Sequence, residues 1–221
     1  MTDSSTAERY YRKSHQVICD LITPENEHLP VPACPGWTLH DLLAHVTGVM
    51  QDFIAGNTEG APGPDWTAAQ VERFRDTRVE AIASAWRASL DHAGPVFRRM
   101  GSQLLPDIVT HEFDVRGALG NTDARQSDRL AAAVEVMTSW GDAHYKSAGI
   151  PALAIQTDRK YATLGGDVPL ATVAASGFET LRFLTGRRSP AQIRALDWSA
   201  DPTPWLDHMS MLGSRDDDLI E

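Results

Sequence analysis

The chain has 221 residues, of which 42% are hydrophobic and 23% charged, and its formal net charge is −10. This composition is that of a globular protein with one large or two small domains, able to bury a core without disulfide bonds. The acidic balance disfavours binding to nucleic acid, and no apolar run approaches the roughly 20 residues of a membrane span. The polar N-terminus resembles no signal peptide, and the two cysteines form no CxxC motif, so we expect a cytoplasmic protein with reduced thiols.

Four or five mostly long helices are predicted in the first part of the chain. Helical spacing of apolar side chains runs from about Thr6 to Thr23 and again after Thr38. Thr38 and Asp41 form a variant of the capping box at the start of this second helix, and Gly56 ends it. Long helices joined by short or irregular segments are typical of a helical bundle. The remaining helical patterns cover about 67–90, 105–119 and 128–147.

The pattern changes after Gly149. The segments 151–158 and 160–166 are predicted to be two short strands joined by a turn. A helix is expected over 170–187, closed by Gly186, and a further helical turn begins at Ser189 and Pro190. We therefore expect two domains, a helical bundle over 1–149 and a small α+β domain over 150–221.

A histidine and a carboxylate lie on the apolar face of the helix predicted at 105–119. Asp107 precedes His111 by one helical turn, so both side chains can face the same point. His45 lies on the apolar face of the helix that follows Thr38. If the two helices pack together, His45, Asp107 and His111 can bind one divalent cation. Imidazole and carboxylate ligands suit zinc, and also nickel, iron or cobalt.

A plainer interpretation of these residues is also open. Each histidine can be a hydrogen-bonded core residue, and an aspartate four residues before a histidine is a common helix pair. Under the metal interpretation, three protein ligands leave coordination positions open, and Asp114, one turn beyond His111, is a candidate to orient that imidazole. Cys34 is interpreted as structural, and Trp37 as a side chain that fixes the loop before the helix.

Three segments carry motifs in common with a known family. The run from Cys34 to His45 and the run from Asp107 to Gly120 resemble two signatures of the mycothiol-dependent maleylpyruvate isomerase family, and "SGFETLRFLTGRR" resembles its C-terminal helix. That family belongs to the DinB-like four-helix-bundle superfamily. The resemblance implies a mainly α fold, a DinB-like four-helix bundle with a small C-terminal α+β domain, and it assigns the metal ligands to His45, Asp107 and His111. The isomerase has glutamate where this chain has Asp107, which is one methylene shorter.

The resemblance also implies a cofactor and a reaction class. The open metal positions would bind the sulfur of mycothiol, a low-molecular-weight thiol of actinobacteria, as a thiolate that attacks an electrophilic small molecule. Arg187 and Arg188 are candidates to bind the cofactor's carboxylate, although arginines at a helix end also complement the helix dipole. The preference for arginine over lysine, with abundant alanine, agrees with a GC-rich actinobacterial host.

Two other functions are compatible with the same residues. One is a metal-dependent hydrolase or amide-forming enzyme, in which water takes the open position. The other is a non-catalytic DinB-like protein that binds a metal or a small ligand. Fold alone does not separate these functions, because unrelated activities share helical bundles. The expected partners are a small-molecule thiol and an electrophilic substrate, with neither nucleic acid nor membrane, and the chain is expected to be a monomer or homodimer.

Overall fold

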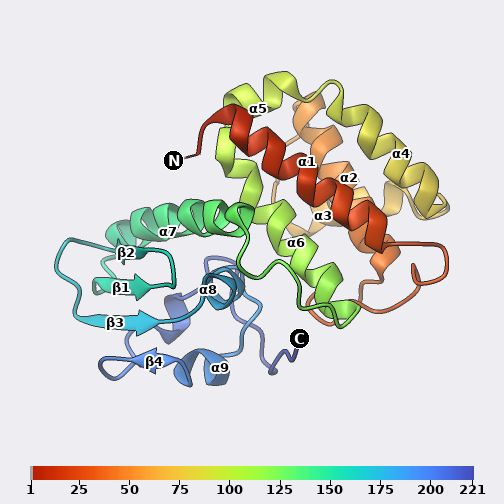
Figure 1. Cartoon of the computed structure of the whole chain (residues 1–221). Helices are drawn as coiled ribbons and strands as arrows, with labels where there is room; N and C mark the ends of the chain where they lie inside the picture. Colours follow the sequence, from red (N-terminus) through yellow and green to blue (C-terminus); the bar gives the residue numbers. More distant parts are fainter. Residues whose placement is uncertain (1) are drawn as a thin grey trace. The chain divides into compact units, whose positions relative to one another are not determined.

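The computed structural model describes residues 2–221 and divides them into two compact units, 2–122 and 123–221. The first unit is helical, and the second combines helices with a small sheet (Figure 1). This is the mainly α fold with a small α+β part that the sequence predicts. Within residues 2–221, no helix combines the length and the apolar character that crossing a membrane requires.

The helices of the N-terminal unit bring the second and sixth helices together. In this unit α1 packs against α5 and α6, while α2 packs against α3, α4 and α6. The two helices on which the sequence places the candidate ligands are therefore neighbours. The unit consists of α1 (Ser4–Leu21), α2 (Leu39–Ala55), α3 (Pro64–Arg73), α4 (Val79–Leu90), α5 (Gly94–Met100), a 3-10 turn (Gly101–Leu104) and α6 (Leu105–Ala118).

Both ends of α2 follow from local sequence. The Thr38 hydroxyl accepts from the backbone N–H of Asp41, and the Asp41 carboxylate accepts from the backbone N–H of Thr38. Gly56 ends the helix in the left-handed conformation, with φ of 75°. The predicted capping box and C-terminal glycine are confirmed, and they place His45 in the second turn of the helix.

The single helix predicted over 67–90 is wrong, because the structure has two helices, α3 and α4, separated by a turn at 74–78. Phe74 and Val79 are both buried. The turn contains neither glycine nor proline, so the local sequence carries no signal of the break. The burial of Phe74 and Val79 on either side of the turn shows that packing accompanies it.

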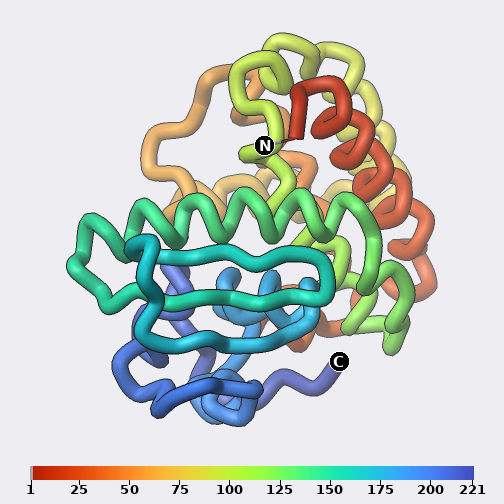
Figure 2. The backbone as a smooth tube through the Cα atoms, turned by 60° about the vertical axis from the view of Figure 1, so that its left-hand side comes forward, coloured from red at the N-terminus to blue at the C-terminus, as the bar shows by residue number. Residues whose placement is uncertain are grey.

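The C-terminal unit forms a helix-covered sheet with strand order β2-β1-β3-β4. Strand β1 pairs antiparallel with β2 and parallel with β3, and β3 pairs antiparallel with β4. Helix α7 packs against β2 and α8, and Figure 2 shows it running alongside the strands. The predicted strand pair is confirmed. The elements are α7 (Asp128–Ala148), β1 (Leu153–Gln156), β2 (Tyr161–Leu164), β3 (Ala171–Ala174), α8 (Gly177–Leu184), α9 (Pro190–Arg194) and β4 (Asp197–Trp198).

The helix predicted over 170–187 is wrong in its first half, which forms strand β3. Ala171 and Val173 are buried and the residues that follow each of them are half-buried, which is the two-residue period of a strand. Ser176 then caps α8 by accepting from the backbone N–H of Glu179. The predicted capping of the next helix, α9, by Ser189 is confirmed.

The division into compact units differs from the expected domain boundary between 149 and 150. Helix α7 belongs to the unit formed by 123–221, because its packing partners are β2 and α8. The change of pattern after Gly149 marks the start of the segment that leads into β1. The contacts of α7 nevertheless place this helix in the same unit as the strands.

A buried histidine occupies the core of the N-terminal unit. His15 is 5% exposed, and its ring meets Trp86 edge to face with 4.6 Å between ring centroids. Its Nε2 lies 3.6 Å from Sγ of Cys19. Burial, followed by the nearby charges of Arg87 and Arg12, lowers the pKa of His15 to about 4. The imidazole is therefore neutral in the folded protein at neutral pH.

His15 is expected to make the folded state less stable as the pH falls from about 6.5 to 4. A histidine in the unfolded chain has a pKa of about 6.5, so in this window the unfolded state binds a proton that the folded state excludes. Above this window the free energy of unfolding has no penalty from His15, and by pH 5 it has fallen by about 2 kcal/mol because of this residue. Urea titrations at pH 7 and pH 5 should show a smaller loss for His15→Gln than for the wild type. An equal loss in both proteins would contradict the assignment.

Candidate metal centre

The structure brings the three predicted ligands together at the α2–α6 contact. Each of the residues His45, Asp107 and His111 offers one ligand atom, and these atoms lie within 4.8 Å of one another. Oδ1 of Asp107 lies 3.6 Å from Nε2 of His111 and 3.9 Å from Nε2 of His45. The two imidazole rings are 5.0 Å apart between centroids and nearly perpendicular. Both Nε2 atoms therefore face the same carboxylate oxygen.

The cluster is open to solvent on the side of its carboxylate. The side chains of His45 and His111 are 7% and 9% exposed, whereas that of Asp107 is 41% exposed. Trp37 covers the imidazoles, with its ring 5.0 Å from that of His45 and nearly parallel to that of His111 at 6.3 Å. Trp37 thus packs on the cluster as well as leading into α2. A small molecule would approach the cluster beside Asp107.

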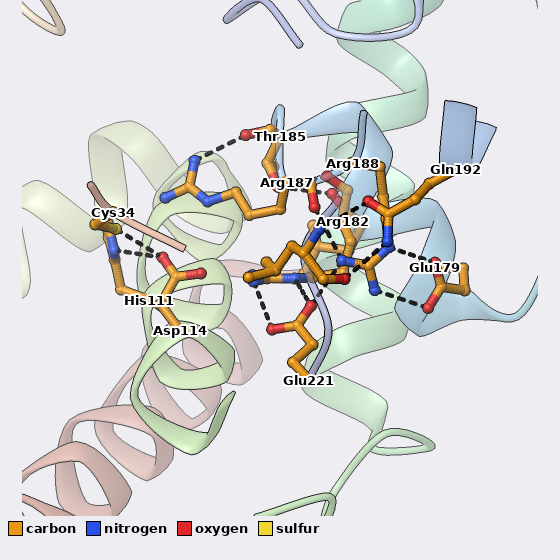
Figure 3. A network of polar contacts seen from close by, with 12 residues as sticks. Cys34, His111, Asp114, Glu179, Arg182, Thr185, Arg187, Arg188, Gln192 and Glu221 are labelled. Carbon is orange, nitrogen blue, oxygen red and sulfur yellow. Dashed lines mark hydrogen bonds and ion pairs between the residues drawn. The ribbon is translucent and has the colours of Figure 1, made fainter. Parts of the chain in front are cut away.

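A buried carboxylate and a thiol lie behind His111 (Figure 3). Oδ2 of Asp114 is 3.0 Å from Nδ1 of His111, at ion-pair distance, although the ring nitrogen is not aligned for a hydrogen bond. The Cys34 thiol donates to the same oxygen at 3.4 Å. Asp114 is fully buried, so its charge acts on His111 with little screening by water. Cys34, His111 and Asp114 form a second group with metal-ligand atoms close together.

The surroundings of His111 favour positive charge. Burial by itself lowers the pKa of this imidazole, but contacts with Asp114 and Cys34 and the charge of Asp107 outweigh burial and raise the pKa to about 10. The largest raising causes are the contacts with Asp114 and Cys34, and the charges of the two flanking carboxylates add to them. The same field would stabilise a bound cation.

Nδ1 of His45 contacts a chain of polar residues that the sequence did not predict. Its Nδ1 lies 2.7 Å from Oε1 of Gln70 on α3, and Nε2 of Gln70 donates to Oδ2 of Asp52 at 2.8 Å. Arg73 donates to the other oxygen of Asp52 at 2.7 Å. Gln70 is fully buried and Asp52 is 3% exposed.

A sequence signal for this contact exists on α2. His45, Gly48 and Asp52 are spaced by three and seven residues and share one face of the helix. A carboxylate on a buried helix face requires a partner, and the glycine allows another helix to approach closely. A Cβ atom at Gly48 would lie 2.7 Å from Cβ of Gln70. The pattern indicates a polar partner opposite Gly48, but it does not say which segment supplies it.

The predicted cofactor-binding arginines belong to the C-terminal unit (Figure 3). Arg188 is buried and bonds to both carboxylate oxygens of Glu179 and to Glu221. Arg187 is half-buried and donates to the backbone carbonyl of Thr185 at 2.7 Å. The contacts of Arg188 explain its burial without a cofactor, and a cofactor role for either arginine stays a prediction.

Comparison with known proteins gives one family and one fold. A family model described as the mycothiol maleylpyruvate isomerase N-terminal domain matches residues 18–139, a range that contains all three candidate ligands. Two solved structures are similar, the mycothiol-dependent maleylpyruvate isomerase with a TM-score of 0.57 and a histidine-to-alanine mutant of that isomerase with 0.61. Both are 12% identical over 91% of this chain and 97% of theirs, so the likeness shows the fold. No curated protein matches the sequence.

Proposed function

Because the chain belongs to the family of the mycothiol maleylpyruvate isomerase N-terminal domain, we propose that it is a divalent-metal-dependent transferase or isomerase that uses mycothiol. The observation that carries the proposal is the convergence of His45, Asp107 and His111, whose ligand atoms lie within 4.8 Å of one another. The second substrate would be an electrophilic small molecule, such as an activated alkene.

The donor set fits a divalent cation. Two imidazole nitrogens and one carboxylate oxygen are typical ligands of catalytic zinc, and they are also compatible with nickel, iron or cobalt. Nδ1 of His45 has Gln70 as a hydrogen-bond partner, as metal-binding histidines usually do, and Nδ1 of His111 lies 3.0 Å from the Asp114 carboxylate. Three protein ligands leave positions for a substrate atom. These features support a catalytic centre over a pair of core histidines.

The residues around the cluster suit the activation of a thiol. A cation bound by His45, Asp107 and His111 would lower the pKa of a thiol that coordinates to it. Trp37 shields the two imidazoles from water, while the exposed side of Asp107 gives the thiol a path. Arg187 and Arg188 of the C-terminal unit are the candidates for the carboxylate of the thiol, and Arg188 also bonds to Glu179 and Glu221.

The proposal is tested by thermal stability in the presence of mycothiol. At about 100 times its Kd, the thiol should stabilise the metal-loaded protein by about 2.7 kcal/mol, which raises the Tm of a chain of this size by about 5–10 °C. Chelator-treated protein, and metal-loaded protein given the disulfide form of mycothiol, are the controls and should show no shift. Retained metal with neither a shift nor thiol turnover would contradict the proposal and favour the hydrolase or binding-protein alternatives.

A further inference from the structure

We propose that Gln70 is a positioning residue that fixes the His45 imidazole in the tautomer with its proton on Nδ1. The lone pair of Nε2 then faces Asp107 and His111 before any ligand arrives. The polar chain that does this runs from Arg73 through Asp52 and Gln70 to His45, and we call it the Asp52 relay. The inference rests on the proposed function only for the identity of what binds at Nε2.

The first step is that Asp52 sets the direction of the Gln70 amide. Asp52 forms an ion pair with Arg73, whose Nη2 lies 2.7 Å from Oδ1, and a carboxylate in an ion pair only accepts hydrogen bonds. The Gln70 atom that lies 2.8 Å from Oδ2 of Asp52 must therefore be the NH₂ group. The opposite orientation would place two acceptor oxygens against each other in a buried site.

The second step is that the amide sets the tautomer of the imidazole. With its NH₂ group on Asp52, Gln70 presents its carbonyl oxygen to Nδ1 of His45 at 2.7 Å. A carbonyl oxygen only accepts, so Nδ1 must donate. A neutral imidazole carries one N–H, and Nε2 is therefore left as an acceptor. It is this nitrogen that faces the carboxylate of Asp107 at 3.9 Å.

The third step is that the relay has little freedom to change. Gln70 is fully buried, so water does not compete for its amide. Its Cβ and Cγ lie so close to Gly48 that a Cβ added there would be 2.7 Å from both. Gly48 lies between His45 and Asp52 on α2, so one face of this helix holds both of these residues and leaves room for Gln70, which joins them.

The closing experiment measures the tautomer directly by ¹⁵N NMR of the imidazoles in the full-length, metal-free protein. Metal must be absent because a cation on Nε2 would itself impose the tautomer. The His45 signals are identified by their loss in His45→Gln, at a pH where this imidazole is neutral. We expect a protonated Nδ1 and an unprotonated Nε2. A proton found on Nε2 in the wild type would overturn the inference.

Two variants test the relay through its polarity. Asp52→Asn removes the fixed acceptor and lets the Gln70 amide turn, so His45 should populate both tautomers and zinc affinity should fall about 10- to 100-fold in a chelator competition. A double variant, Asp52→Asn combined with Gln70→Glu, moves the carboxylate by one position along the relay. The introduced amide can then donate to the introduced carboxylate, which accepts from Nδ1 of His45, so the tautomer and the affinity should both recover.

The matched control is Gln51→Ala, which removes another acceptor of Arg73 outside the relay and should change neither readout. A merely structural role for Asp52 would leave the tautomer unchanged in Asp52→Asn and would give no recovery in the double variant, and either result in a folded protein overturns the inference. The NMR sample contains neither metal nor thiol, so the tautomer is measured independently of the proposed enzyme activity. Absence of that activity would not overturn the inference about the tautomer, and the two failures are distinguishable.

Discussion

His45→Ala is expected to lower the affinity for zinc by more than about 100-fold and to abolish thiol turnover. Loss of an outer partner of a ligand costs 10- to 100-fold, and His45 would be a direct ligand. The residue is buried, and its Nε2 lies 3.9 Å from Oδ1 of Asp107. Metal content of the purified protein by mass spectrometry, followed by chelator competition, gives the measurement.

The control for this prediction is a histidine on the same helix. His40 is half-buried on α2, and its Nε2 contacts the backbone carbonyl of Thr77 at 2.8 Å, away from the cluster. His40→Ala should keep the metal and its affinity. If both variants keep the metal, or if the wild type binds none, then His45 and His111 are core histidines and the proposed centre does not exist.

Glu112→Ala is expected to lower the free energy of unfolding by about 3–5 kcal/mol, the cost of leaving a buried charge without its partner. Glu112 is fully buried on α6, where Oε1 accepts from Nε of Arg116 at 2.9 Å and Oε2 accepts from the Ser14 hydroxyl of α1 at 2.7 Å. The variant would leave the Arg116 guanidinium in a site that is only 9% exposed. Urea titration followed by circular dichroism measures the loss.

The chain offers a matched pair of the same type on its surface. Glu8 and Arg12 are also four residues apart on a helix and form an ion pair at 2.7 Å, but their side chains are 32% and 41% exposed. Glu8→Ala should therefore cost less than about 1 kcal/mol. Equal losses in the two variants would show that burial does not govern the strength of these pairs.

The carboxylate–histidine pair of the candidate site was predictable from sequence because it is local. Asp107 and His111 are four residues apart on one helix, and helical geometry alone places them on one face. Placing His45 beside this pair required the assumption that its helix packs against the helix of Asp107 and His111. The motifs of the family resemblance supported that assumption. Gln70 was out of reach, since it lies on a helix that the sequence analysis merged with the next one.

The contacts of Arg188 show the opposite case. Arg187 and Arg188 follow the predicted end of a helix and are candidates to bind a cofactor carboxylate, a role that stays a prediction. In the structure Arg188 bonds to Glu179 and to Glu221, the last residue of the chain. A contact between residues 33 positions apart leaves no trace in local spacing.

The sequence by itself determined the features that involve only residues within one or two helical turns of each other. These are the capping box of Thr38 and Asp41, the glycine end of α2 and the shared face of Asp107 and His111, because each depends on atoms a few residues apart. Tertiary structure decided which segments meet: the break that splits α3 from α4, the strand β3, and the contact of Gln70 with His45. These features depend on burying side chains from distant parts of the chain in one core. The free energy gained by that burial arises only when the segments pack together, so no single segment reveals it.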